Sequence, residues 1–182
     1  MREKVRRAAD LAAGRPLIRE RLATPFPVQK VAEVDHVEAK LDVYGDGSEK
    51  QAIQALLVEH GLQDHVTLHG YRADWVGQAT AADIFLNLSE VEGFCIVVAE
   101  AMLAGLPVIA LDVGGIRDYG LDGENMLKLS AADAQGARAA ILRLMVDQSL
   151  RERLGRRARA DMLQRYDAAA CRQQVAEALS SP

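Results

Sequence analysis

The stretch SEVEGFCIVVAEAMLAGLPVIALDVGG, residues 89–115, decides the fold of this 182-residue chain. Its first half predicts a turn around Gly93 and then an apolar helix over 95–104 that stops at Gly105. Its second half contains PVIAL, which predicts a strand over 107–111. A short strand that is almost wholly apolar is typical of the centre of a parallel sheet covered on both faces. The stretch therefore indicates a helix followed directly by a buried parallel strand.

Short strands and helices alternate on both sides of this stretch. Strands are predicted over 39–44, 65–69, 84–88, 107–111 and 125–129. Helices are predicted over 48–60, 74–82, 95–104 and from 130 onward. Such alternation favours right-handed crossovers between parallel strands. We therefore expect an α/β fold: a Rossmann-like parallel β-sheet with helices on both faces, followed by C-terminal helices.

Several predicted helices carry end signals. Ser48 and Gln51 are spaced as a capping-box pair at the start of the first helix. Ser130 and Asp133 are placed to cap the helical C-terminal part. That part is predicted to break near Gln148-Ser149 and Tyr166-Asp167 into about three helices.

Composition excludes several classes of protein. With 49% apolar and 26% charged residues, the chain is neither disordered nor of low complexity, and its length suits one domain. A net charge of −4 argues against a nucleic-acid-binding domain, for which a basic face is expected. No apolar run approaches the roughly 18 residues that span a bilayer. The two cysteines, Cys95 and Cys171, suit a reducing cytoplasm.

Residues 1–38 form a segment that is basic at its start and poorly readable. Residues 1–22 carry seven basic and three acidic side chains, a local charge of +4. One interpretation is a basic amphipathic helix that touches an anionic membrane or a partner. The other, which we favour, is a solvated helix or the trimmed edge of a larger protein.

Two glutamates flank the predicted helix start at 95. Glu92 lies in the strand-to-helix turn, and Glu100 follows inside the helix. A helix N-terminus suits a phosphate, and Gly93 lets such a ligand approach the backbone closely. Because a carboxylate repels a phosphate, the glutamates are better suited to bind sugar hydroxyls. The pattern indicates a nucleotide-sugar site; the alternative is a helix-surface Glu100 and a Glu92 that merely favours the helix N-terminus.

These motifs, in this order and spacing, resemble the C-terminal donor-binding domain of the retaining GT-B glycosyltransferases of family 4, or glycosyl transferases group 1. The matching motifs from Leu41 to Tyr166 are YGDG (44–47), V-x-x-x-G (66–70), the strand ending in Ser89 (82–89), E-x7-E with its Glu-Ala-Met extension (92–102), G-x-P-V-I (105–109), the Gly-Gly turn (114–115) and DGEN (122–125). The resemblance implies that residues 39–165 form a nucleotide-sugar-binding Rossmann-like domain, the C-terminal half of a GT-B fold. Residues 166–182 would form a C-terminal helix.

The resemblance also implies roles for individual residues. Glu92 would be the catalytic residue beside the donor sugar, where it positions and stabilises charge rather than acting as a nucleophile. Glu100 would bind the ribose hydroxyls of the nucleotide. The other implied donor-binding residues are Ser89, Gly93, Phe94 and Cys95 near the helix start, Gly45 and Gly47 in the first turn, and Tyr71, whose backbone would lie near the base.

Other candidate chemistry is weak. His60, His65 and His69 lie close together in sequence, but no cysteine or carboxylate completes a ligand set at motif spacing, so no metal site is predicted. Cys95 has no histidine near it in sequence, which argues against a reactive thiol. The family's basic clamp on the leaving diphosphate has no clear match, because no Lys-Gly follows Gly14-Arg15. No cofactor is expected; the expected substrate is a UDP-, GDP- or ADP-sugar.

The resemblance covers only one half of a GT-B enzyme. We therefore expect a hexosyltransferase-type donor-binding half, nearly inactive alone, whose N-terminal acceptor-binding domain is missing or separate. The alternative is a non-catalytic nucleotide-sugar-binding or regulatory domain that acts through a partner, and a third is a flavodoxin-like domain without a ligand. The family suggests polysaccharide biosynthesis in the cytoplasm, with peripheral contact at the inner face of the membrane.

Overall fold

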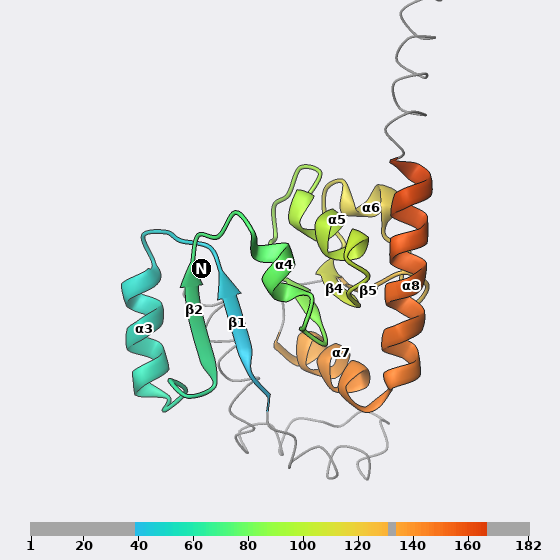
Figure 1. Ribbon diagram of the computed structural model, residues 1–182. Helices are drawn as coiled ribbons and strands as arrows, with labels where there is room; N and C mark the ends of the chain where they lie inside the picture. The colour runs from blue at the N-terminus through green and yellow to red at the C-terminus, as the bar shows by residue number, and fades with distance from the viewer. Residues whose placement is uncertain (1–38, 131–133, 167–182) are drawn as a thin grey trace, which may run out of the picture. The chain divides into compact units, whose positions relative to one another are not determined.

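The computed structural model describes residues 39–130 and 134–166, which form two compact units (Figure 1). The first unit contains residues 39–78 and 134–146, and the second contains the other described residues. Strands and helices alternate along the chain, and the strand pairs of both units are parallel. The predicted α/β class with parallel strands is confirmed.

In the first unit, a helix packs on a two-stranded sheet. β1 (Leu41–Tyr44) pairs with β2 (Val66–Gly70), and α3 (Lys50–Glu59) connects them. The unit's buried apolar cluster joins the helix to both strands through Ile53, Leu57, Leu62 and Val66, with Leu41, Val43 and Leu68 packed against them. Apolar residues alternate along the strands and recur four apart in the helix, so one sheet face meets one helix face. The unit also includes α7 (Ala134–Val146) and most of α4 (Trp75–Ala79).

In the second unit, three parallel strands have the order β3-β4-β5. β4 (Val108–Leu111) lies between β3 (Phe85–Asn87) and β5 (Leu127–Leu129). All four residues of β4 are buried, as its continuous apolar sequence predicts for a central parallel strand. Because the strands are parallel, the loops that follow β3 and β4 leave the same edge of the sheet.

Two helices of the second unit pack closely together. α5 (Ile96–Leu103) contacts α8 (Gln148–Arg165), which Figure 1 shows as a long helix beside it. The large apolar stripe of α8 is buried at every fourth position: Leu150, Leu154, Ala158 and Met162. A Cβ on Gly155 would come within 2.1 Å of the Gly105 carbonyl oxygen, just past the end of α5. The missing side chain at Gly155 therefore sets how closely α8 approaches.

α8 is rich in arginine. Its 18 residues include six arginines, and one of them, Arg159, donates a hydrogen bond to the Leu103 carbonyl at 2.6 Å. This interaction satisfies a carbonyl in the last turn of α5. Among the helices of the described ranges, none is long and apolar enough to cross a membrane.

The predicted capping box at the start of α3 is wrong. The helix begins at Lys50, without a side-chain cap from the preceding residue, so Ser48 and Gln51 do not act as a pair. Asp46 orders the turn instead, because its carboxylate accepts hydrogen bonds from the Gly47 N–H at 2.9 Å and the Lys50 ammonium at 3.2 Å. A charged donor and acceptor form a stronger bond than a serine hydroxyl does.

The described strands form two parallel sheets, β1-β2 in the first unit and β3-β4-β5 in the second. The predicted break near 148–149 is confirmed one residue earlier, at Asp147, whose side chain accepts a hydrogen bond from the Leu150 N–H at 2.9 Å and caps α8. Predictions for the basic segment, the Asp133 cap and the C-terminal helix beyond Tyr166 fall on residues 1–38, 131–133 and 167–182, outside the described residues.

Replacing Gly155 with alanine tests the contact between α5 and α8. At an open helical site this change stabilises by up to about 1 kcal/mol, but here the new methyl group would overlap the Gly105 carbonyl. We expect Gly155→Ala to lower the free energy of unfolding by about 1–3 kcal/mol in urea. The control Gly77→Ala in α4, where a Cβ meets no atom within 4 Å, should be neutral or stabilising. Equal effects of the two changes would contradict the close contact.

Candidate functional site

The predicted site residues form two groups, each at the carboxyl ends of parallel strands. The group of the second unit lies between β3 and α5 and within α5, and consists of Ser89, Glu92, Gly93, Phe94, Cys95 and Glu100. The group of the first unit follows β1 and β2, and consists of Gly45, Gly47 and Tyr71. Carboxyl ends are where open α/β sheets bind ligands. The structure thus places five of the predicted residues in the loop and helix start after β3, Glu100 within α5, and three at the strand ends of the first unit.

Cys95 defines the start of α5. It is buried and adopts a left-handed conformation, with φ 62° and ψ 67°, which costs a residue with a side chain roughly 1–2 kcal/mol. The Asn87 amide donates to the Cys95 thiol, with 3.4 Å between Nδ2 and Sγ. The same side chain accepts a hydrogen bond from the Ser89 N–H at 2.8 Å. Asn87, the last residue of β3, therefore ties the strand end to the helix start.

The loop before α5 packs tightly on the Gly-Gly turn that follows β4. The Gly115 N–H donates to the Gly93 carbonyl at 2.5 Å. A Cβ on Gly114 would lie 2.0 Å from the Glu92 carbonyl oxygen, and Gly114 also has a positive φ of 51°. Only glycine fits at this position. The Gly114-Gly115 turn, predicted as a sequence motif, therefore packs directly against the loop before α5.

The start of α5 leaves backbone donors available. The helix has no side-chain cap hydrogen bond at Cys95. Within residues 39–130 and 134–166, the N–H groups of Phe94 and Cys95 donate to no protein acceptor. An anion at this position would accept their hydrogen bonds and meet the positive end of the helix dipole.

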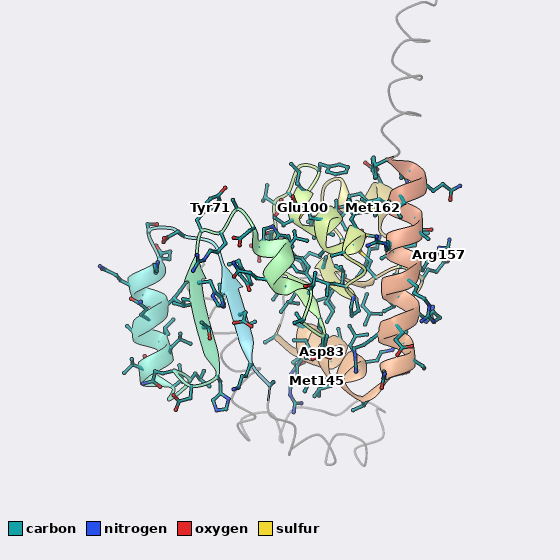
Figure 2. All side chains as sticks on the ribbon, viewed as in Figure 1. Tyr71, Asp83, Glu100, Met145, Arg157 and Met162 are labelled. Atoms are coloured by element: carbon teal, nitrogen blue, oxygen red, sulfur yellow. The ribbon has the colours of Figure 1, made fainter. Side chains whose placement is uncertain are left out.

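Both predicted glutamates of the second unit are partly buried. Figure 2 labels Glu100, which lies in the second turn of α5 between the buried Ala99 and Ala101. Burial, and to a lesser extent the negative Glu92 carboxylate, raise the pKa of Cys95 to about 11. The thiol therefore stays protonated at neutral pH, which favours a structural role for Cys95.

The residues of the first unit form a turn beside a strand end. The Gly45 N–H donates to the Gly70 carbonyl at 2.8 Å, which joins the ends of β1 and β2. Gly47 lies in the Asp46–Lys50 turn, where the Lys50 ammonium holds the pKa of Asp46 below its usual value. Tyr71 is 78% exposed and is therefore accessible at this edge.

The histidines make structural contacts. His69 Nε2 lies 2.6 Å from Asp42 Oδ1, and the His69 ring stacks on Tyr44 with 4.7 Å between ring centroids. His65 Nδ1 is buried without a hydrogen-bond partner among the described residues. Across the described ranges, no group of three His, Cys, Asp or Glu residues could hold a metal ion.

Two residues that hold the loop were missed by the sequence analysis, Asn87 and Tyr119. Tyr119 ends α6 (Ile116–Tyr119), a four-residue helix that was not predicted. Its hydroxyl donates to the Phe94 carbonyl at 2.9 Å, and its ring packs against the Phe94 ring. The available signal was an aromatic residue four positions after Gly115. This signal could be interpreted only from the structure, in which α6 packs against the loop before α5.

The described residues combine parallel strands with a helix start that has available N–H groups and with a Gly-Gly turn that packs against the loop before that helix. This is the α/β architecture of GT-B glycosyltransferases. Its sequence matches the family described as Glycosyl transferases group 1 over residues 27–161. This match covers well over half of the chain, and the chain belongs to that family.

Relatives and solved structures agree with this assignment. The chain is 32% identical over 133 residues to N-acetyl-alpha-D-glucosaminyl L-malate synthase of Bacillus anthracis. The aligned region covers 73% of this chain and 35% of that protein. It is 33% identical over 113 residues to the lipopolysaccharide core biosynthesis glycosyltransferase LpsE of Rhizobium meliloti, covering 62% and 33%. The chain therefore spans about a third of the length of these curated relatives.

Two solved structures show the similarity of fold. Anabaena Alr3699/HepE in complex with UDP and glucose has a TM-score of 0.73 at 28% identity, covering 85% of this chain and 44% of that chain. Sucrose-phosphate synthase from Thermosynechococcus elongatus has a TM-score of 0.76, covering 98% and 42%, and at 24% identity it supports the fold alone.

The left-handed backbone of Cys95 predicts which substitutions the loop accepts. Valine is branched at Cβ and poorly tolerates a positive φ, whereas alanine tolerates it better. We expect Cys95→Val to lower the free energy of unfolding by about 2–3 kcal/mol and Cys95→Ala by about 1 kcal/mol. Urea denaturation measures both. A valine variant as stable as the alanine variant would contradict the conformation of Cys95.

The raised pKa of Cys95 predicts a loss of stability at alkaline pH. The unperturbed pKa is 9.0 and the folded one about 11, so between these values the folded chain keeps a proton that the unfolded chain has lost. Stability therefore falls as pH rises through this window. Relative to Cys95→Ala, we expect the wild type to lose about 1 kcal/mol of stability between pH 8 and pH 10. A difference that stays constant with pH would show that the thiol is not shielded.

Proposed function

We propose that this chain binds a nucleoside-diphosphate sugar and serves as the donor-binding part of a retaining glycosyltransferase. The observation that carries the proposal is the start of α5, where the Phe94 and Cys95 N–H groups are available between Glu92 and Glu100 in the chain. This arrangement suits a diphosphate at the helix end and sugar hydroxyls on the carboxylates. The UDP and glucose in the Anabaena Alr3699/HepE complex support the same class of ligand.

In this proposal, each group acts on a different part of the donor. The loop N–H groups bind the diphosphate, whose negative charge grows as it leaves. Glu92 positions the sugar and stabilises positive charge at its reacting carbon, and Glu100 binds the ribose hydroxyls. Gly45, Gly47 and Tyr71 are included as donor-binding residues because they follow the carboxyl ends of β1 and β2, where parallel strands commonly bind ligands. Ser89, held by Asn87, belongs to the same set.

The complete transfer reaction requires an acceptor-binding domain. We propose that this is an N-terminal Rossmann-like domain, carried on the same longer protein or on a separate subunit. The support is the extent of the match, which is 35% of the Bacillus anthracis relative and 44% of the Anabaena chain. Hexosyl transfer from a UDP-, GDP- or ADP-sugar without a cofactor, for polysaccharide assembly at the cytoplasmic face of a membrane, belongs to the same proposal.

Calorimetric titration of the chain with UDP, GDP, ADP and their sugars tests donor binding. We expect one nucleotide to bind, and Glu100→Ala to weaken it about 10- to 100-fold, because charge-assisted hydrogen bonds to the ribose are lost. The matched control is Glu59→Ala, which removes an exposed glutamate at the end of α3 and should leave the affinity unchanged. If no nucleotide binds, the proposal fails.

Reconstitution separates a transferase from a non-catalytic binding domain. An N-terminal domain from a group 1 glycosyltransferase is fused to the chain or added in trans, and sugar transfer to that domain's acceptor is measured. Transfer that Glu92→Gln abolishes supports the enzyme. Tight nucleotide binding without transfer in either arrangement supports a regulatory module instead.

A further inference from the structure

The Tyr119 side chain extends from α6 to the backbone of the loop before α5. The side chain is only 2% exposed, and its burial raises the pKa of the hydroxyl. The hydroxyl lies 2.9 Å from the Phe94 carbonyl oxygen and 3.3 Å from the Cys95 carbonyl oxygen. A phenol has one proton to donate, and the shorter distance assigns it chiefly to Phe94.

The Gly93 carbonyl, next to the Phe94 carbonyl in the loop, is also held by residues 115–119. The Gly93 carbonyl accepts the Gly115 N–H, and the Phe94 carbonyl accepts the Tyr119 hydroxyl. In a trans peptide unit, the carbonyl of one residue and the N–H of the next point in opposite directions. Anchoring these two carbonyls on the 115–119 segment therefore turns the N–H groups of Phe94 and Cys95 away from it.

Tyr119 is itself fixed in position. The Asn125 side chain, fully buried, donates to the Tyr119 carbonyl at 3.0 Å and to Asp161 of α8 at 2.9 Å. The Tyr119 and Phe94 rings pack with 5.3 Å between their centroids. The Tyr119 backbone is thus linked through Asn125 to α8, on which Figure 2 labels Arg157 and Met162.

We propose that Tyr119 is a positioning residue for the proposed donor site: its hydroxyl, together with the Gly115 N–H, orients the Phe94 and Cys95 amides toward a bound diphosphate. This inference rests on the proposed function. Without the hydroxyl, the Phe94 peptide loses the bond that fixes its orientation, and its partly buried carbonyl loses this partner. The effect should fall on the diphosphate and not on the nucleoside, because only the loop amides depend on this peptide.

The test compares Tyr119→Phe with Tyr166→Phe, using whichever of UDP, GDP and ADP the wild type binds and its parent nucleoside. Tyr166 is a matched control, because its ring packs edge-on against Phe94 and, among the described residues, its hydroxyl makes no hydrogen bond. NMR titration is expected to show Tyr119→Phe weakening the diphosphate about tenfold and the nucleoside less than about twofold. Tyr166→Phe should change neither. Equal weakening of both ligands, or no weakening, overturns the inference.

A second measurement needs no ligand and separates this inference from the proposed function. In a Cys171→Ala background, the rate at which a thiol reagent labels Cys95 reports how often the loop opens. Tyr119→Phe should raise that rate about tenfold over Tyr166→Phe, because one of the bonds that close the loop is gone. Equal rates overturn the positioning role. Absence of any nucleotide binding by the wild type overturns the proposed function and, with it, the diphosphate part of this inference.

Discussion

The close approach of two backbone segments is the constraint on which the rest of the candidate site depends. The turn after β4 touches the loop before α5 at a distance where a Cβ on Gly114 would overlap the Glu92 carbonyl. This contact allows the Gly115 N–H to reach the Gly93 carbonyl, and α6 begins at once, so Tyr119 lies within reach of the next peptide. A side chain at 114 would separate the segments and release both anchors together.

Sequence patterns predicted the strands, the longer helices and the fold class, because strands and helices bury faces with simple periods. PVIAL over 107–111 could be recognised as a central strand from its apolar residues alone, and β4 is buried throughout. The start of α3 could not be predicted, since whether a serine caps a helix depends on its competitors. Here the Asp46 carboxylate orders the turn by pairing with Lys50, and Ser48 does not cap the helix. The local sequence does not show whether such a salt bridge or a serine hydroxyl will form the stronger interaction.

The sequence analysis proposed members of the candidate site but missed the residues that support its loop. Glu92, Gly93 and Glu100 stand out because their types and spacing suggest chemistry. Asn87 and Tyr119 act through contacts with residues eight and 25 positions away. Such pairings depend on tertiary packing, in which a polar side chain finds a backbone carbonyl or a thiol. Their effect is nevertheless specific, since both hold the short segment whose peptide orientations decide where N–H groups point.

The two ends of α5 differ in whether a side chain satisfies their backbone groups. At the C-terminal end, the Arg159 guanidinium satisfies the Leu103 carbonyl, while the N-terminal end has no side-chain cap. Eight residues are too few for a helix to be stable without outside support. A diphosphate bound there would act as the missing cap, so ligand occupancy would add directly to folding stability. If the chain binds a sugar donor as proposed, its lifetime against cellular proteases would then follow the supply of that donor.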